Sequence, residues 1–558
     1  MSVIVSTRVA PAPRAPIAQS RVSLWTRPLF HCVILVGVFF AAIAPTLAWQ
    51  EFTGGMENFN VATAIETVRD GHWLLPYLQG EPRTKKPPLT QWITALGLMT
   101  SQSRPWGARW PSLLMASLTL PAVYEMGRIV GGRRLALLSA LICGSSFMFL
   151  KFAHQASYDV QLALWVTLCN LCIALAIFRR RWIFGFVAAG IALGLALMTK
   201  GPVAILQTAI PVVSWIAWRR YHRQPLMRHQ DREVIAWAVT AGGALALALS
   251  LTWTIWVMWR LPGLPTQWAG EVTLSVESKF EQRFGWHSYL VFIPEMFPWL
   301  LWLMAGLWLA FKSKMLNPRL QLIFFWLLVP VLVMTFFPER RDRYLLPMIG
   351  PAAIISAWAM LRLLGRTHGF GSTGEVLIRV QWGMLALLAV SLPLAGALYL
   401  RRADDPGHWY SPAFALIAIV VGLWVIFYGL RMCGGSWKGV AAASFALMLF
   451  THGLYLHGYA QSRDGRSEAK VFVERLVKRI PDARFVNANH RGCPLEFAIY
   501  LDRVVPTVVD VAALEVEHRP LVVFDREKEM PTPPAGFSLL DSTMINKERW
   551  NAYVRVGE

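Results

Sequence analysis

The chain has 558 residues, of which 55% are hydrophobic and only 16% are charged. A soluble domain carries roughly 25% charged residues, so these proportions exclude a water-soluble globular protein and make lipid the expected solvent. The net charge of +21 does not indicate a nucleic-acid partner, because the basic residues form short clusters between apolar runs, as the positive-inside rule predicts for a membrane protein.

About thirteen apolar runs are long enough to cross a hydrocarbon core of roughly 30 Å as helices. They lie near residues 30–49, 109–129, 134–151, 159–178, 182–199, 202–219, 234–259, 288–311, 319–337, 344–364, 380–400, 411–430 and 439–459. Residues 1–29 carry several arginines ahead of the first run, which places the N-terminus in the cytoplasm. We therefore expect an all-α polytopic membrane domain over residues 30–459.

The segment 89–100 is apolar but too short to span comfortably. If it crossed the membrane, six basic loops, among them 179–181 and 219–232, would face outward; if it lies in the interface, all six face the cytoplasm. We therefore predict an interfacial helix. The long loop 50–108, the turn at 154–159, the loop 260–287 and the tail after residue 460 then lie on the outer side.

The tail, residues 460–558, has the composition of a soluble domain. Helical periodicity covers residues 466–480, and short apolar segments at 484–488, 504–509 and 520–524 are typical of buried strands. We predict a small α/β domain outside the cytoplasm.

Two acids are candidates for chemistry at the outer surface. Glu57 directly precedes a short helix predicted over residues 62–68, where it could meet a substrate or simply favour the helix start through the dipole. Asp159 lies at the outer end of a span, and a carboxylate there should face a protein-lined cavity rather than lipid.

Basic residues gather on the same side. Lys85 and Lys86 precede a rigid Pro87-Pro88 step and suit phosphate binding, although such lysines also extend toward lipid headgroups. Three arginines within residues 338–343 violate the positive-inside rule, and a bound anion is the simplest reason.

Four segments together resemble the bacterial polyprenyl-phosphate-dependent glycosyltransferases of the C-type (GT-C) fold. They are residues 57–92, residues 153–164, Leu197-Met-Thr-Lys-Gly-Pro202 and Arg343-Tyr-Leu-Leu-Pro347. Within that group the chain is most similar to the aminoarabinose lipid A transferase family, which is related to protein O-mannosyltransferases. The resemblance implies transfer of a sugar, first 4-amino-4-deoxy-L-arabinose, from an undecaprenyl phosphate carrier to lipid A or another envelope acceptor. The site would face the periplasm from the bacterial inner membrane.

The resemblance also implies roles for individual residues. Asp159 matches the second family carboxylate, and Lys86 matches the lysine that contacts the carrier phosphate, with Lys85 adjacent. Arg343 and Tyr344 fall where the family has a basic and aromatic pair before a span.

Two family positions match less well. Lys279 or Arg283 corresponds only loosely to the family's phosphate-binding arginine, because loop lengths differ. The family opens its first loop with an Asp-Glu pair; here Met56 replaces the aspartate and Glu57 remains.

Three alternatives remain open at this stage. The chain could transfer another sugar to protein or O-antigen, move the lipid-linked sugar across the membrane as a flippase, or bind the carrier without catalysis. The sequence requires no cofactor; the outer acids could hold a divalent cation, but no ligand spacing argues for one. No nucleotide-binding fingerprint appears in the cytoplasmic loops, which agrees with a lipid-linked donor.

Overall fold

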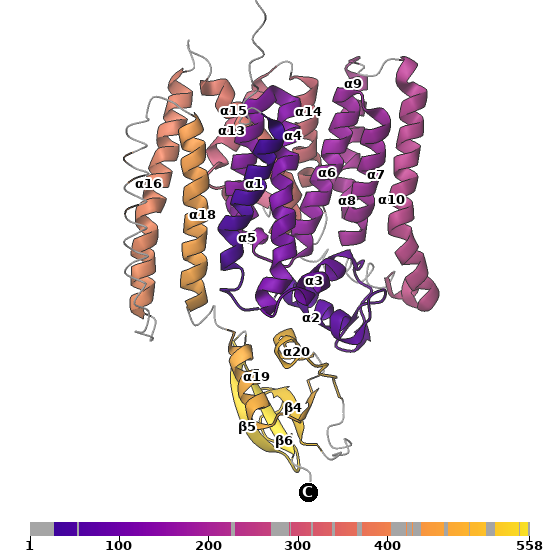
Figure 1. Ribbon diagram of the computed structural model, residues 1–558, viewed down its shortest axis with the longest axis vertical. Helices are drawn as coiled ribbons and strands as arrows, with labels where there is room; N and C mark the ends of the chain where they lie inside the picture. The colour runs from indigo at the N-terminus through magenta and orange to yellow at the C-terminus, as the bar shows by residue number, and fades with distance from the viewer. Residues whose placement is uncertain are drawn as a thin grey trace, which may run out of the picture.

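The computed structural model describes residues 27–52, 55–224, 229–268, 289–290, 292–313, 316–336, 341–364, 371–402, 437–461, 467–489, 492–508, 519–545 and 547–555, with residues 420, 424 and 427. A helical bundle makes up most of this part, and a small α/β unit lies beyond one end of it (Figure 1). This arrangement confirms the predicted fold class.

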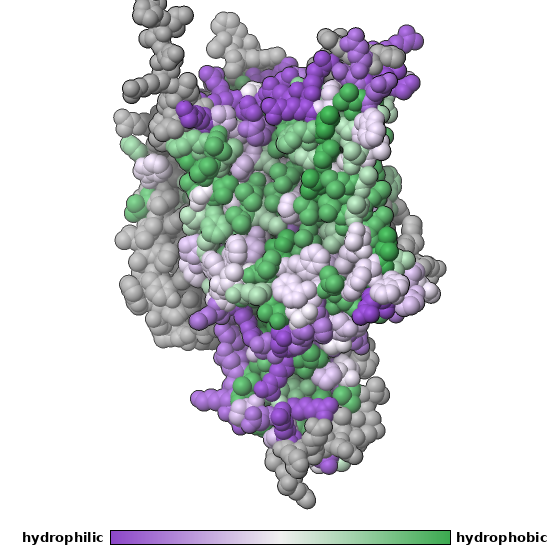
Figure 2. Space-filling view, turned by 45° about the vertical axis from the view of Figure 1, so that its right-hand side comes forward, coloured by the Kyte–Doolittle hydropathy of each residue, from purple (hydrophilic) through white to green (hydrophobic). Residues whose placement is uncertain are grey.

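Among the described residues, eight helical stretches are long and apolar enough to cross a membrane. They comprise α1 (Pro28–Ile43) with the short η2 (Ala44–Thr46), α4 (Arg104–Ser145), α6 (Tyr158–Arg179), α7 (Trp182–Lys200), α10 (Arg232–Arg260), α14 (Pro318–Thr335), α15 (Ile349–Leu364) with η5 (Asp342–Met348), and α16 (Gly371–Arg402). Figure 2 shows an apolar band across the visible face of the bundle, between two hydrophilic ends. The chain is therefore an integral membrane protein.

Shorter helices occupy other predicted spans: α5 (Phe147–Ala153), α8 (Val203–Gln207), α9 (Ala209–Tyr221), α12 (Phe292–Glu295) and α13 (Leu300–Lys312). The span expected at 439–459 lies within the 25-residue helix α18 (Trp437–Gln461). The expected single span at 202–219 is divided at Thr208. Pro211 has no N–H to donate to the Gln207 carbonyl, which accepts from the Asn170 amide instead. The span expected at 411–430 lies outside the described residues apart from three isolated positions.

Helix α4 contains the predicted span 109–129 and residues 134–145 of the next one as antiparallel arms, and the rest of the second span, residues 147–151, lies in α5. Gly131 and Gly132 depart from helical geometry between the arms, and Gly132 has a positive φ of 81°. A Cβ on Gly127 would lie 2.9 Å from Ala136 Cα, so the arms are in backbone contact directly beside the reversal. This contact explains why a small residue is needed there.

Helices α2 (Gly55–Asp70) and α3 (Leu89–Met99) lie between the bundle and the C-terminal unit (Figure 1). A small ribbon, β1 (Tyr77–Leu78) and β2 (Glu81–Pro82), connects them. The helix predicted over 89–100 is confirmed. The helix predicted over 62–68 was too short: α2 runs from Gly55 to Asp70, and Asn60 in its first half is buried and donates to Thr94 and to the Ala156 carbonyl.

The C-terminal unit has helices α19 (Glu468–Arg479) and α20 (Leu495–Leu501) and a four-stranded sheet of order β3-β4-β6-β5. Strand β3 (Arg484–Asn487) is parallel to β4 (Leu521–Arg526), and β6 (Glu548–Arg555) is antiparallel to both β4 and β5 (Ser538–Ile545). The strand predicted over 504–509 was wrong in extent: within its described part only Thr507 bridges to Asn487. The hairpin β5–β6 was not predicted.

Candidate functional site

Four chain segments meet at the end of the bundle that faces α2 and α3. They are the loop before α3, the first turn of α6, the last turn of α7 and η5. Because α6 and α7 are antiparallel neighbours joined by a short turn, the start of one lies beside the end of the other. Each segment contributes at least one polar side chain to a common cluster.

Asp159 is the acid of this cluster. It lies in the first turn of α6, where the helix dipole favours a carboxylate, and is only 3% exposed. Its Oδ1 accepts a hydrogen bond from the ammonium group of Lys200, the last residue of α7. Its Oδ2 lies 3.6 Å from Nε of Arg343 in η5. A buried carboxylate paired in this way fixes the positions of both cations.

Two tyrosine rings line the same cluster. The Lys200 ammonium lies 4.0 Å from the ring centre of Tyr344, and the Lys86 ammonium lies 5.1 Å from that of Tyr158. Cation–π contacts of this kind hold a lysine without neutralising its charge. The Tyr158 hydroxyl is 2.6 Å from the Gln91 amide of α3, which ties that ring to the first loop.

The cluster has more positive than negative groups. Lys86, Lys200 and Arg343 surround the single carboxylate of Asp159, so these four side chains together carry a positive charge. Loss of contact with water, together with the neighbouring Lys200 charge, lowers the pKa of Lys86 from 10.5 to about 8, while Asp159 partly opposes that shift. An anion bound beside Lys86 would relieve this repulsion.

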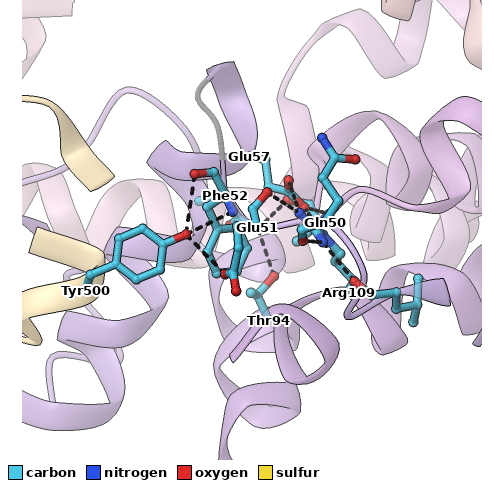
Figure 3. A network of polar contacts seen from close by, with 10 residues as sticks. Gln50, Glu51, Phe52, Glu57, Thr94, Arg109 and Tyr500 are labelled. Carbon is cyan, nitrogen blue, oxygen red and sulfur yellow. Dashed lines mark hydrogen bonds and ion pairs between the residues drawn. The ribbon is translucent and has the colours of Figure 1, made fainter. Parts of the chain in front are cut away.

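Glu57 belongs to a second network rather than to this cluster (Figure 3). Its carboxylate forms a two-pronged ion pair with Arg109, with distances of 2.8 and 2.9 Å. Its Oε1 also accepts the backbone N–H of Ala156 at 2.8 Å. The two networks are therefore joined through the backbone between Ala156 and Asp159.

The structure brings together four of the residues singled out in the sequence: Lys86, Asp159, Arg343 and Tyr344. Lys85 is exposed beside them. Met56 is half-buried in the first turn of α2. Lys279 and Arg283 lie outside the described residues.

Lys200 and Arg109 were missed as functional residues in the sequence. Lys200 lies one residue beyond an apolar run and directly before a Gly-Pro step, which is a helix-end signal rather than a site signal. Arg109 marked the polar border of a predicted span, yet it is 3% exposed. Over the described ranges, no group of three or more His, Cys, Asp or Glu side chains is placed to hold a metal ion.

Comparisons with known proteins agree with this architecture. Residues 85–256 match the family model described as dolichyl-phosphate-mannose-protein mannosyltransferase. An undecaprenyl phosphate-alpha-4-amino-4-deoxy-L-arabinose arabinosyl transferase of Erwinia tasmaniensis is 24% identical, over 83% of this chain and 80% of its own. A second such transferase, from Proteus mirabilis, is 25% identical over 84% of both chains.

Solved structures extend the likeness to three dimensions. The crystal structure of ArnT from Cupriavidus metallidurans in the apo state superposes with a TM-score of 0.72 at 18% identity, covering 94% of this chain and 97% of that one. The same protein bound to undecaprenyl phosphate also gives 0.72, at 19% identity and with coverage of 94% and 98%. This likeness shows that the two proteins share the GT-C fold. The predicted resemblance is confirmed: over most of its length the chain is similar to polyprenyl-phosphate-dependent glycosyltransferases, the aminoarabinose transferases among them.

Proposed function

We propose that the chain is a membrane glycosyltransferase that moves a sugar from an undecaprenyl phosphate carrier to an envelope acceptor. The first choice of sugar is 4-amino-4-deoxy-L-arabinose, and the first choice of acceptor is a phosphate group of lipid A. The observation that carries the proposal is the group of three cations around one buried carboxylate at the end of the bundle. The names of the relatives support the donor and the acceptor.

The cluster suits the departure of a phosphate. During transfer, the bond between the sugar's anomeric carbon and the carrier phosphate oxygen breaks, and the acceptor oxygen bonds to that carbon. The carrier phosphate keeps the electron pair and gains negative charge, which Lys86 and Arg343 would stabilise electrostatically. Asp159 would hold Lys200 and Arg343 in place before the carrier arrives.

The ion pairs and hydrogen bonds made by the two acids favour a phosphate acceptor over a hydroxyl. A hydroxyl must lose its proton during transfer, usually to a positioned base. Asp159 is engaged by Lys200 and Arg343, and Glu57 is engaged by Arg109 and the Ala156 N–H. A phosphate acceptor is already an anion, so it needs no such base.

The orientation in the membrane is part of the proposal. Basic residues such as Arg133, Arg180 and Arg219 lie at the ends of helices opposite the cluster, which supports a cytoplasmic location for that side. The cluster and residues 460–558 would then face the periplasm of a bacterium from its inner membrane, and residues 1–29 would be cytoplasmic. Lys85, and Lys279 or Arg283 on the resemblance alone, would add contacts to the carrier phosphate.

The test is transfer of label by the purified protein in detergent, from radiolabelled undecaprenyl phosphate-aminoarabinose to lipid A. We expect label on lipid A, with a loss of about a hundredfold or more in Asp159→Asn, which leaves Lys200 without its charged partner. Transfer of label to a peptide instead of lipid A would show that the acceptor is a protein. Carrier binding without any transfer would favour the non-catalytic alternative, and movement of intact carrier across vesicles would favour the flippase.

A further inference from the structure

The Arg109 guanidinium is enclosed by one short segment of the chain. Besides Glu57, it donates to the backbone carbonyls of Leu47 and Gln50 at 2.8 and 2.5 Å. The Cζ atom of Arg109 also lies 5.0 Å from the ring centre of Phe52. The segment 47–52 therefore forms one wall of the Arg109 site, and Glu57 forms the other.

Helix α2 holds the turn that leads to Asp159. The N–H of Ala156 donates to Glu57, and the carbonyl of Ala156 accepts from the Asn60 amide at 2.9 Å. Ala156 is fully buried, so water does not compete for these bonds. Both polar groups of this residue are fixed by α2, and Asp159 follows three residues later.

The C-terminal unit holds the segment 47–52 from outside (Figure 3). The Tyr500 hydroxyl in α20 donates to Glu51 Oε2 at 3.2 Å and accepts the N–H of Phe52 at 3.1 Å. The Lys470 ammonium in α19 binds Glu51 Oε1 at 2.6 Å. A continuous chain of polar contacts thus joins α19 and α20 to Arg109, Glu57 and the turn before Asp159.

We propose that the C-terminal unit is a structural part of the transfer site, and that Tyr500 and Lys470 are positioning residues for Asp159. They act through Glu51 and the Arg109–Glu57 pair, and Glu57 is accordingly a positioning residue and not the base of the reaction. The assignment of Asp159 to the transfer site rests on the proposed function. The physical link from Tyr500 to the turn at 156–159 does not.

The link is tested by hydrogen exchange on the full-length protein in detergent. Tyr500→Phe removes one hydroxyl that bonds both Glu51 and Phe52, and we expect the amides of residues 156–159 to exchange about threefold faster or more. Tyr553→Phe is the matched control, because the Tyr553 hydroxyl is also buried in the C-terminal unit but bonds the Met530 carbonyl instead. Equal exchange in wild type, Tyr500→Phe and Tyr553→Phe would overturn the link.

The role of Glu57 is tested by transfer kinetics. Glu57→Gln alone leaves a buried arginine unpaired and can fail to fold, so the decisive variant is Glu57→Gln with Arg109→Gln, which replaces the ion pair with a neutral amide pair. A positioning role predicts a kcat within about tenfold of wild type, an unchanged KM for the carrier and an unchanged pH profile. Loss of a hundredfold or more in kcat, with a changed pH profile, is the result for a general base and would refute the assignment.

The two proposals fail in different ways. If the wild-type protein transfers no sugar under any condition, the proposed function is wrong, and the exchange experiment still decides whether the C-terminal unit fixes the turn. If sugar is transferred and Tyr500→Phe leaves both exchange and kcat unchanged, only the positioning role is lost. We expect Tyr500→Phe to lower kcat about threefold or more, and Tyr553→Phe to leave it unchanged.

Discussion

The half-buried ammonium group of Lys86 should make carrier binding depend on pH. Burial and the Lys200 charge lower its pKa to about 8, so it loses its proton well below pH 10.5 in the free protein. A bound phosphate favours the charged form and raises this pKa. Affinity is therefore greatest below pH 8, where Lys86 is already protonated, and it falls as the pH rises, because binding must then take up a proton.

The size of the effect follows from the shift. If a bound phosphate restored the ordinary pKa of 10.5, the total loss of affinity from well below pH 8 to well above pH 10.5 would be about 300-fold, or roughly 3.4 kcal/mol. Between pH 7 and pH 9 we expect a loss of about tenfold. Lys86→Arg should remove the pH dependence while keeping the charge, since a guanidinium does not titrate in this range.

The measurement is the Kd of undecaprenyl phosphate for the full-length protein in lipid nanodiscs at about pH 7, 8 and 9. A phosphate monoester has its second pKa near 6, so the ligand itself hardly titrates over this range. Lys86→Met should bind weakly at every pH with a flat profile. A pH dependence of the Kd that persists in Lys86→Arg would assign the titration to another group. An equal Kd for the wild-type protein at all three pH values would refute the reasoning.

Two further predictions concern stability. A Cβ on Gly190 in α7 would lie 2.1 Å from the Gly242 carbonyl oxygen in α10, so Gly190→Val should separate these helices and lower the Tm by several degrees in a thermal scan. Gly243→Val is the control, because a Cβ on Gly243 would have no atom within 4 Å. An equal fall in Tm in both variants would contradict the packing argument. Phe524→Ala empties the centre of the C-terminal core, where the ring meets three other phenylalanines with centroids 4.7 to 6.1 Å away, and should cost about 3–5 kcal/mol. Chemical denaturation followed by near-UV circular dichroism measures that loss, and a change under 1 kcal/mol would show that the core relaxes around the gap.

The membrane part was largely predictable because lipid imposes a simple rule on the backbone. A run of about twenty apolar residues must form a helix to satisfy its own polar groups, so most spans appear directly in the sequence. Breaks within spans were not predicted. Pro211 was visible in the run 202–219, but proline inside a membrane-spanning helix is also tolerated where a neighbouring group bonds the freed carbonyl, as the Asn170 amide does here for Gln207.

The cluster was predictable in part. Asp159 and Arg343 were found because charge at the outer end of a span is costly and needs a reason. Lys86 was found because two lysines before a rigid Pro-Pro step suit phosphate binding. Lys200 was not found, because α7 is apolar on every side and its periodicity does not tell which way its last residue points. The hairpin β5–β6 was not found, because residues 538–545 lack the regular alternation of apolar and polar side chains that identifies a half-buried strand.

The reversal of α4 at Gly131 and Gly132 also has a consequence for how the protein can change in evolution. One arm begins near Arg109, and the other leads through α5 to Ala156. These two residues therefore lie near each other only while both arms extend equally far from the glycine pair. Deleting about four residues from one arm would displace its end by one helical pitch, roughly 5 Å, and separate Arg109 and Glu57 from the turn. Insertions should be tolerated at the reversal itself, where extra residues can protrude from the membrane without altering either arm. Natural length variation in relatives should therefore collect at this glycine pair and be absent from the arms.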